Sequence, residues 1–203
     1  METGQVNERF HAEKEMVMET LFVIGAGTMG GGIAQVAALN GFTVYLYDIK
    51  QEFVDKGLKG IVGAWDKLVA RGKMAAEDRD AALPRIIGTL DMQDAAKADV
   101  VIEAAVEDLD VKRSIFAKLD CIVSPGCILA TNTSSLSVTA VASAVGSPDK
   151  VVGLHFFNPV PRMALIEIIR GAATSDETYE AAKALSERLG KTGVTVNEYP
   201  GFV

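Results

Sequence analysis

The chain of 203 residues is 49% hydrophobic and 23% charged, which is typical of one soluble globular domain, alone or with a short appendage. Its formal net charge of -7 argues against nucleic acid as a main partner, although a local basic pocket could still bind a phosphorylated ligand. The longest apolar runs fall far short of the roughly 18–20 residues that cross a membrane, so we expect no membrane partner.

The first predicted elements follow a polar stretch, residues 1–17, which we interpret as a flexible tail because its periodicity is weak. The folded domain is then expected over 18–203. An apolar run over 20–25 predicts a buried strand, the spacing over 31–41 predicts a helix that ends at a glycine, and 42–48 predicts a second strand. A strand, a glycine turn, a helix and a strand within about 30 residues have the size of a βαβ unit.

Residues 50–80 have helical spacing, with Gly57, Gly60 and Gly63 at intervals of three. We interpret these glycines as a small-residue face that allows another element to pack closely. A second short helix is expected to break before Pro84, so that 50–85 forms a helical hairpin inserted in the α/β pattern.

The rest of the chain alternates between apolar runs and amphipathic segments. Strands are expected at 99–105, 127–133, 151–157, 163–170 and 192–198, and helices at 108–123, 137–145 and 176–190. This alternation predicts an α/β fold of the Rossmann type, with a doubly wound, mostly parallel sheet. Cys121 and Cys127 are too few for a disulfide framework and lack metal-site spacing, so we expect reduced thiols in or near the core of a cytoplasmic protein without a metal.

A glycine-rich turn lies between the first predicted strand and helix. Its residues Gly25, Gly27, Thr28, Met29 and Gly30 follow the G-x-G-x-x-G spacing, and Asp48 ends the second strand. In this context the glycines permit a tight turn, a close approach of a pyrophosphate and close packing of the helix on the strand. Asp48 would accept hydrogen bonds from the adenosine ribose and repel a 2′-phosphate, which favours NAD over NADP, while a tight turn without a ligand is the alternative.

Polar residues interrupt the later strands. His155 and Glu167 lie inside apolar runs, where an imidazole could accept a proton at neutral pH and a carboxylate could orient it. From position alone, a hydrogen-bonded core histidine is the simpler interpretation. Asn132 and Asn158 end strands, where ligands bind in open α/β sheets, although both could form turns. Ser134 could contact a substrate oxygen, or it could cap the helix at 137–145.

Five motifs then occur together in one order: "VIGAGTMGGGIAQ", "VIEAAVEDLDVK", "LATNTSSLSVT", "GLHFFNPVPRMALIEII" and "PGFV". On these motifs, residues 19–203 resemble the 3-hydroxyacyl-CoA dehydrogenases, and most of all the bacterial 3-hydroxybutyryl-CoA dehydrogenases. The resemblance implies NAD as cofactor and an acyl-CoA as substrate. It also implies a smaller helical domain after "PGFV", which is absent from this sequence and through which family members largely oligomerise.

The resemblance assigns roles to matching positions. It implies that His155 is the general base, that Glu167 orients it and that Ser134 binds the reacting oxygen. It places Asn158 at the nicotinamide side of the cofactor, and it makes Glu107 and Lys112 cofactor contacts rather than a solvated helix start. Lys67 and Arg71, four apart on one helix face, would bind CoA phosphates, with Lys73 a weaker candidate; ordinary surface charge is the alternative.

The implied reaction is the NAD-dependent oxidation of an (S)-3-hydroxyacyl-CoA, most simply 3-hydroxybutyryl-CoA, to the 3-oxoacyl-CoA, a step of fatty acid and butyrate metabolism. Two other interpretations stay open. The chain could be a dinucleotide-binding fragment that turns over poorly by itself, or a dehydrogenase of the same family that acts on a sugar acid.

Overall fold

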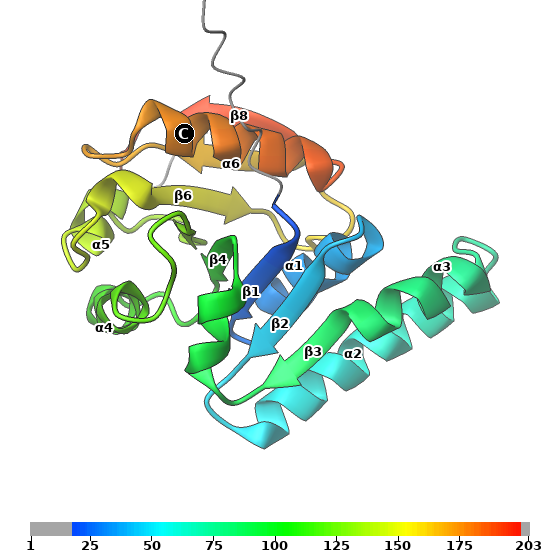
Figure 1. Cartoon of the computed structure of the whole chain (residues 1–203). Helices are drawn as coiled ribbons and strands as arrows, with labels where there is room; N and C mark the ends of the chain where they lie inside the picture. The colour runs from blue at the N-terminus through cyan, green and yellow to red at the C-terminus, as the bar shows by residue number, and fades with distance from the viewer. Residues whose placement is uncertain (1–17, 200–203) are drawn as a thin grey trace, which may run out of the picture.

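The computed structural model describes residues 18–199, so the predicted tail at 1–17 and the motif at 200–203 lie outside the described residues. Eight strands form one sheet (Figure 1). They are β1 (Thr20–Ile24), β2 (Thr43–Tyr47), β3 (Ile86–Thr89), β4 (Val100–Glu103), β5 (Ile128–Thr131), β6 (Val151–Phe156), β7 (Leu165–Ile169) and β8 (Thr192–Val196).

The strands lie in the order β3-β2-β1-β4-β5-β6-β7-β8. Every neighbouring pair is parallel except β6 and β7, which are antiparallel. The first six strands thus have the order of a dinucleotide-binding Rossmann sheet. The predicted doubly wound, mostly parallel sheet is confirmed.

Helices cover both faces of the sheet. They are α1 (Thr28–Leu39), α2 (Gln51–Ala70), α3 (Ala76–Ala82), α4 (Leu109–Asp120), α5 (Val138–Ala142) and α6 (Asp176–Arg188), with short 3₁₀ turns at Leu83–Arg85, Met92–Lys97 and Pro148–Lys150. Side chains alternate along β1, so that Leu21 and Val23 pack in one core with α1, α2 and α6, while Phe22 and Ile24 pack in the other with α4 and α5. This alternation fixes the register of the central strands, because a slip of one residue would exchange the two cores.

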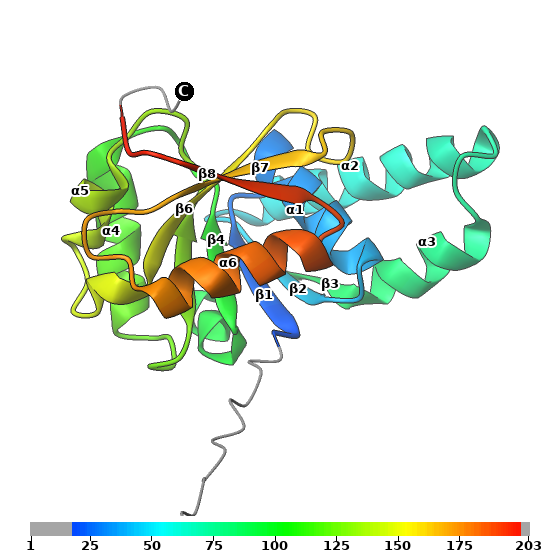
Figure 2. The same cartoon turned by 90° about the horizontal axis from the view of Figure 1, so that it is seen from above.

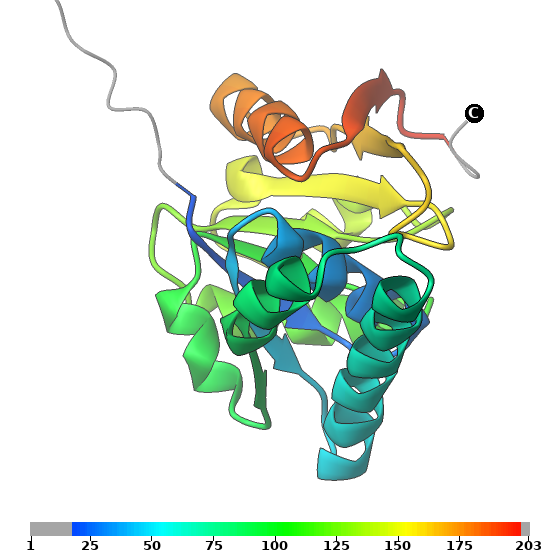
Figure 3. The same cartoon turned by 90° about the vertical axis from the view of Figure 1, so that its right-hand side faces the viewer.

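The hairpin of α2 and α3 reaches beyond the edge of the sheet (Figure 2), and it lies in front of the sheet when the molecule is seen from that side (Figure 3). Ile61 and Trp65 on α2 are buried in one core with side chains of α1 and with Ala82 of α3, which holds the hairpin against the sheet domain. The expected small-residue face is only partly correct. A Cβ on Gly57 would lie 2.7 Å from the carbonyl oxygen of Ala26, whereas a Cβ on Gly60 or Gly63 would meet nothing within 4 Å.

Strand β3 was not predicted, because its four residues include Gly88 and lie at the edge of the sheet. Its side chains are half-buried or exposed, so they lack the apolar run of a central strand. Gly88 is required by packing: a Cβ there would lie 2.6 Å from a methyl group of Val54 on α2. The strand is thus set by the hairpin that crosses it, and local propensity does not reveal it.

The cysteine prediction is correct for one thiol. Cys127 is buried, and burial raises the pKa of its thiol to about 12, whereas Cys121 is exposed on the surface. Among residues 18–199, no helix combines the length and apolarity needed to cross a membrane. The same described residues contain no cluster of three or more His, Cys, Asp or Glu side chains suited to a metal ion.

The parallel strands β1, β4, β5 and β6 all end at the same edge of the sheet. This edge carries the glycine turn after β1, residues 104–108 after β4, residues 132–135 after β5 and residues 157–158 after β6. The candidate residues of four distant segments therefore meet at one edge, which is where ligands bind in open α/β sheets.

Candidate functional site

The glycine turn between β1 and α1 is tight. Gly25 has a φ of +99°, and a Cβ there would lie 2.6 Å from the carbonyl oxygen of Ala104. A Cβ on Gly30 would lie only 1.8 Å from the carbonyl oxygen of Gly25. Both positions therefore require glycine, the first for its conformation and both for space.

The N-terminus of α1 is arranged to receive an anion. Gly27 is the N-cap, and within the described chain no side chain caps this helix or places an acidic group in its first turn. A Cβ on Gly27 would meet nothing within 4 Å, so this position faces open space. Thr28 lines the adjoining cavity of about 400 Å³ between α1 and α2. The outward N–H groups and the helix dipole fit a pyrophosphate here.

Asp48 at the end of β2 is tied to the glycine turn. Its Oδ2 accepts a hydrogen bond of 2.8 Å from the backbone N–H of Ala26, and its Oδ1 accepts one of 2.7 Å from that of Ile49. A carboxylate has about four lone-pair sites, so capacity remains for two ribose hydroxyls. The carboxylate lies between the glycine turn and a larger cavity, which is the position expected for an adenosine ribose if a dinucleotide binds here.

That larger cavity, of about 810 Å³, lies beside Asp48 and has a mainly apolar lining. Ile49 is 72% exposed and Val106 is 63% exposed, and Phe53 and Val111 complete this surface. Exposed apolar side chains around a cavity suit a flat aromatic ring such as adenine. Sequence reasoning did not identify these residues, although the apolar Ile49 directly after Asp48 and the apolar Val106 directly before Glu107 could have indicated them.

His155 and Glu167 are direct cross-strand neighbours on β6 and β7. His155 Nδ1 lies 2.7 Å from Glu167 Oε2, and the two side chains are 17% and 12% exposed. The His155 ring also contacts the Phe157 ring, with centroids 4.6 Å apart. The carboxylate therefore fixes the orientation of the imidazole, and Nε2 becomes the nitrogen through which a proton could be exchanged with a ligand.

A cavity of about 310 Å³ brings the predicted residues of the other end of the site together. Its lining includes Met29 from α1, Glu107, Asn132, Ser134, His155 and Asn158. Asn132 also joins two strands, because its Oδ1 accepts a hydrogen bond of 2.9 Å from the N–H of Phe156. The side chains expected to act on a substrate thus surround one small cavity, at the opposite end of the glycine turn from Asp48.

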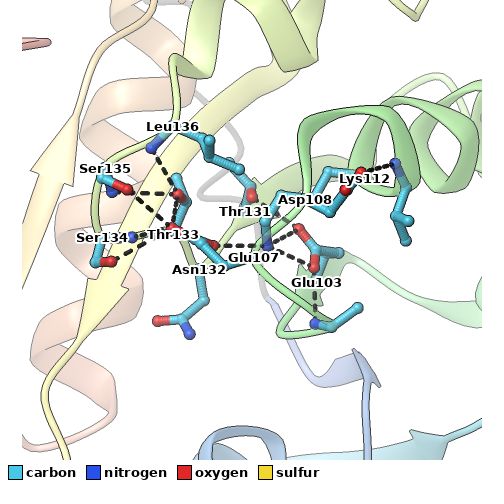
Figure 4. Close-up of polar contacts among 12 residues, drawn as sticks. Glu103, Glu107, Asp108, Lys112, Thr131, Asn132, Thr133, Ser134, Ser135 and Leu136 are labelled. Atoms are coloured by element: carbon cyan, nitrogen blue, oxygen red, sulfur yellow. Dashed lines mark hydrogen bonds and ion pairs between the residues drawn. The ribbon is translucent and has the colours of Figure 1, made fainter. Parts of the chain in front are cut away.

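Glu107 organises the loop that carries Ser134 (Figure 4). Its Oε1 accepts hydrogen bonds from the hydroxyl of Thr133 at 2.5 Å and from the N–H of Ser134 at 2.9 Å, while the Ser134 hydroxyl is more distant, at 3.3 Å. Burial raises the pKa of the Glu107 carboxyl, but these hydrogen bonds and the charge of Lys112 outweigh it, so the pKa lies below its usual value. Glu107 is therefore an ionised acceptor that holds the loop in place.

Lys112, predicted as a cofactor contact, does not line the cavity, and the alternative of a solvated helix start is wrong, because the side chain is buried. Its side chain is fully buried, and Nζ lies 2.8 and 2.9 Å from the two carboxylate oxygens of Glu103 and 3.5 Å from Glu107 (Figure 4). Glu103 also accepts hydrogen bonds from Thr131 and from the N–H of Ala105. Lys112 thus lies behind Glu107 and can act on a ligand only through it.

Glu103 and Thr131 were not predicted as part of this site. An acidic residue at the end of the apolar run "DVVIEAA" was the available signal, of the same kind as the signal for Glu167. The predicted capping alternative for Ser134 is also wrong, because Ser137 is the N-cap of α5 and accepts a hydrogen bond of 3.0 Å from Ala140. Ser134 is exposed at the cavity instead.

The basic residues proposed for CoA lie apart from the cavities that hold the other site residues. Lys67 and Arg71 are exposed near the end of α2, and among the described residues neither forms a salt bridge. Lys73 lines a separate cavity between α1 and the hairpin. The structure therefore keeps these cations available to solvent without joining them to the glycine turn or to His155.

Residues 20–199 match the family model described as 3-hydroxyacyl-CoA dehydrogenase, NAD binding domain. The chain is 50% identical over 181 residues to a "Probable 3-hydroxybutyryl-CoA dehydrogenase" of Deinococcus radiodurans, a match that covers 89% of this chain and 65% of the relative. It is 45% identical to the 3-hydroxyadipyl-CoA dehydrogenase of Escherichia coli, covering 92% of this chain and 39% of that protein.

Among solved structures, the chain resembles the (S)-3-hydroxybutyryl-CoA dehydrogenase of Ralstonia eutropha, with a TM-score of 0.90 and 45% identity. This match covers 92% of the chain and 66% of that structure. The chain thus spans about two thirds or less of the length of these relatives.

Proposed function

The chain belongs to the 3-hydroxyacyl-CoA dehydrogenase family, whose NAD-binding domain it carries, and from this premise we propose that it oxidises (S)-3-hydroxyacyl-CoA to 3-oxoacyl-CoA with NAD. The observation that carries the proposal is the hydrogen-bonded His155–Glu167 pair at the same sheet edge as an uncapped glycine turn. The substrate would be a short acyl-CoA such as 3-hydroxybutyryl-CoA, as the names of the relatives suggest.

The residues present fit NAD. Gly25, Gly27 and Gly30 would hold the pyrophosphate against α1, and Asp48 would bind the adenosine ribose. The nicotinamide end would lie beside Asn132, Asn158 and Glu107, since these residues line the cavity at the other end of the glycine turn from Asp48. When bound, NAD supplies the hydride acceptor for the oxidation of a secondary alcohol.

The protein's own groups would manage the proton. His155 would take the proton of the substrate hydroxyl through Nε2, and Glu167 would stabilise the resulting imidazolium through Nδ1–H. Ser134 would donate its hydroxyl to the reacting oxygen. Its contact with Glu107 is long, at 3.3 Å, so the hydroxyl can turn to the substrate while the Ser134 N–H keeps the loop attached to Glu107. Lys67 and Arg71 would bind the phosphates of CoA.

A second candidate is a dinucleotide-binding domain with little turnover by itself. It is favoured by the solvent exposure of Ser134 and Asn158, because water at the site weakens the interactions that orient a reacting group. NADH binding by calorimetry and the reduction of acetoacetyl-CoA should be measured on the same sample. NADH binding together with acetoacetyl-CoA reduction supports the dehydrogenase, and NADH binding with negligible reduction supports the second candidate. Without NADH binding, both fail.

The charge of Asp48 is expected to decide which cofactor binds. NADH should bind at least about tenfold more tightly than NADPH, because Asp48 repels a 2′-phosphate at contact distance. Asp48→Asn should narrow this difference, since the amide oxygen can still accept from Ala26 while the charge is lost. Fluorescence titration measures both affinities, with Asp55→Asn on the exposed side of α2 as the control. Equal or tighter NADPH binding by the unmodified chain would contradict the role of Asp48.

A further inference from the structure

Lys191 is a buried cation that the proposed chemistry does not use. It lies between α6 and β8, and the residue is only 9% exposed. Within the described chain no carboxylate pairs with it; its Nζ donates to the carbonyl oxygens of Val160 at 2.8 Å and Met163 at 2.6 Å. Burial lowers the pKa of this ammonium, because removing the charged group from water disfavours it. The Lys191 side chain therefore connects the start of β8 to the backbone at Val160 and Met163.

The segment held by Lys191 is the loop 157–164 between β6 and β7. His155 lies just before this loop on β6, and Glu167 lies just after it on β7. The loop also carries Asn158, which lines the cavity with His155. The conformation of this loop therefore sets the position of Asn158 and the register between β6 and β7, the strands that carry His155 and Glu167.

The opposite side of the same loop rests on α1. Val160 is 2% exposed, and a Cβ on Gly32 of α1 would lie 2.8 Å from the Cβ of Val160. At the end of the loop, the N–H of Thr192 donates to the carbonyl oxygen of Ala164 at 2.8 Å. The loop is thus fixed between the helix that begins at the glycine turn and the ammonium of Lys191.

We propose that Lys191 is a positioning residue for the nicotinamide end of the site. Its ammonium holds loop 157–164 against α1, so that Asn158 and the His155–Glu167 pair keep their place relative to the glycine turn. The adenosine end lies away from this loop, because none of residues 157–164 lines either of the two cavities that Asp48 borders. The inference rests on the proposed function, since it assumes that a dinucleotide spans both ends.

This assignment is tested by binding NADH and ADP-ribose, which lacks nicotinamide, to the full chain by calorimetry. Lys191→Met keeps the apolar stem and removes the donors. This variant should lower the affinity for NADH by about tenfold, the size of one lost hydrogen bond to a charged group. Its affinity for ADP-ribose should change by less than about threefold. Lys191→Arg should restore most of the NADH affinity. Lys183→Met, on the exposed side of α6, is the matched control and should change neither ligand.

Val160→Ala offers a second variant that removes the contact on the other side of the loop. It should give the same selective loss of NADH affinity with a smaller size, which keeps the inference testable if Lys191→Met does not fold. The inference is overturned if Lys191→Met, or Val160→Ala in its place, leaves NADH binding unchanged or weakens both ligands equally. Failure of the unmodified chain to bind either ligand would instead refute the proposed function.

Discussion

Replacing His155 with glutamine is expected to lower turnover of 3-hydroxybutyryl-CoA by about 10²–10⁴-fold, the usual contribution of a general acid or base. Glutamine is similar in size and can still hydrogen-bond to Glu167, so the cross-strand pair on β6 and β7 should remain folded. It cannot accept the proton of the substrate hydroxyl. NADH affinity should stay nearly unchanged, because the glycine turn and Asp48 do not contact this residue.

The measurement combines steady-state turnover with the melting temperature, in a chain extended by the helical domain of a relative. The sequence contains only two histidines, so His11→Gln provides the same substitution at the other one, outside the described residues. The two histidines also allow the imidazole of His155 to be identified by NMR and its titration followed. A large loss of stability with little change in turnover would show that His155 is a core residue, which was the simpler interpretation from its position alone.

The His155–Glu167 pair was predictable because both of its members interrupt apolar runs. His155 and Glu167 each occupy a strand whose neighbouring residues are buried, and a polar group in such a place needs a partner. Their direct pairing depends on β7 being antiparallel to β6, which the sequence pattern alone did not specify. The first βαβ unit was also predictable, because the strand, the glycines and the helix spacing agree locally.

The parts that sequence reasoning missed depend on contacts between distant segments. Lys112 lies in a polar stretch that predicts a solvated helix start, yet its ammonium is buried and forms a salt bridge with Glu103, nine residues earlier. Lys191 follows the glycine that ends α6, and nothing local indicates that its side chain reaches a loop about thirty residues away in sequence. Pairing over such separations is decided by topology and burial, and so it appears only once the sheet is assembled.

Replacing Gly30 with alanine is expected to affect both stability and cofactor binding more than any other single methyl group added to the turn. The added Cβ would lie 1.8 Å from the carbonyl oxygen of Gly25 and 3.3 Å from a methyl group of Val23. Gly25 cannot move away easily, because its Cα packs against the carbonyl group of Ala104, where even an added Cβ would not fit. Helix α1 must therefore shift from β1, which opens the turn that would receive the pyrophosphate.

The melting temperature of Gly30→Ala should fall by about 2–12 °C, since overpacking a tight site costs about 1–3 kcal/mol and a protein of this size loses about 2–4 °C per kcal/mol. NADH affinity should fall by at least about 100-fold, because the N–H groups at the N-terminus of α1 would no longer all point at the pyrophosphate. Gly31→Ala is the matched control for stability. It adds the same methyl group one residue later, where a Cβ meets nothing within 4 Å, and alanine favours a helix over glycine. Gly31→Ala should therefore melt at the same or a higher temperature. If Gly30→Ala melted with it and bound NADH within about threefold of the unmodified chain, the helix would not be held against the turn by this contact, and the glycine turn would lose its role in binding the cofactor.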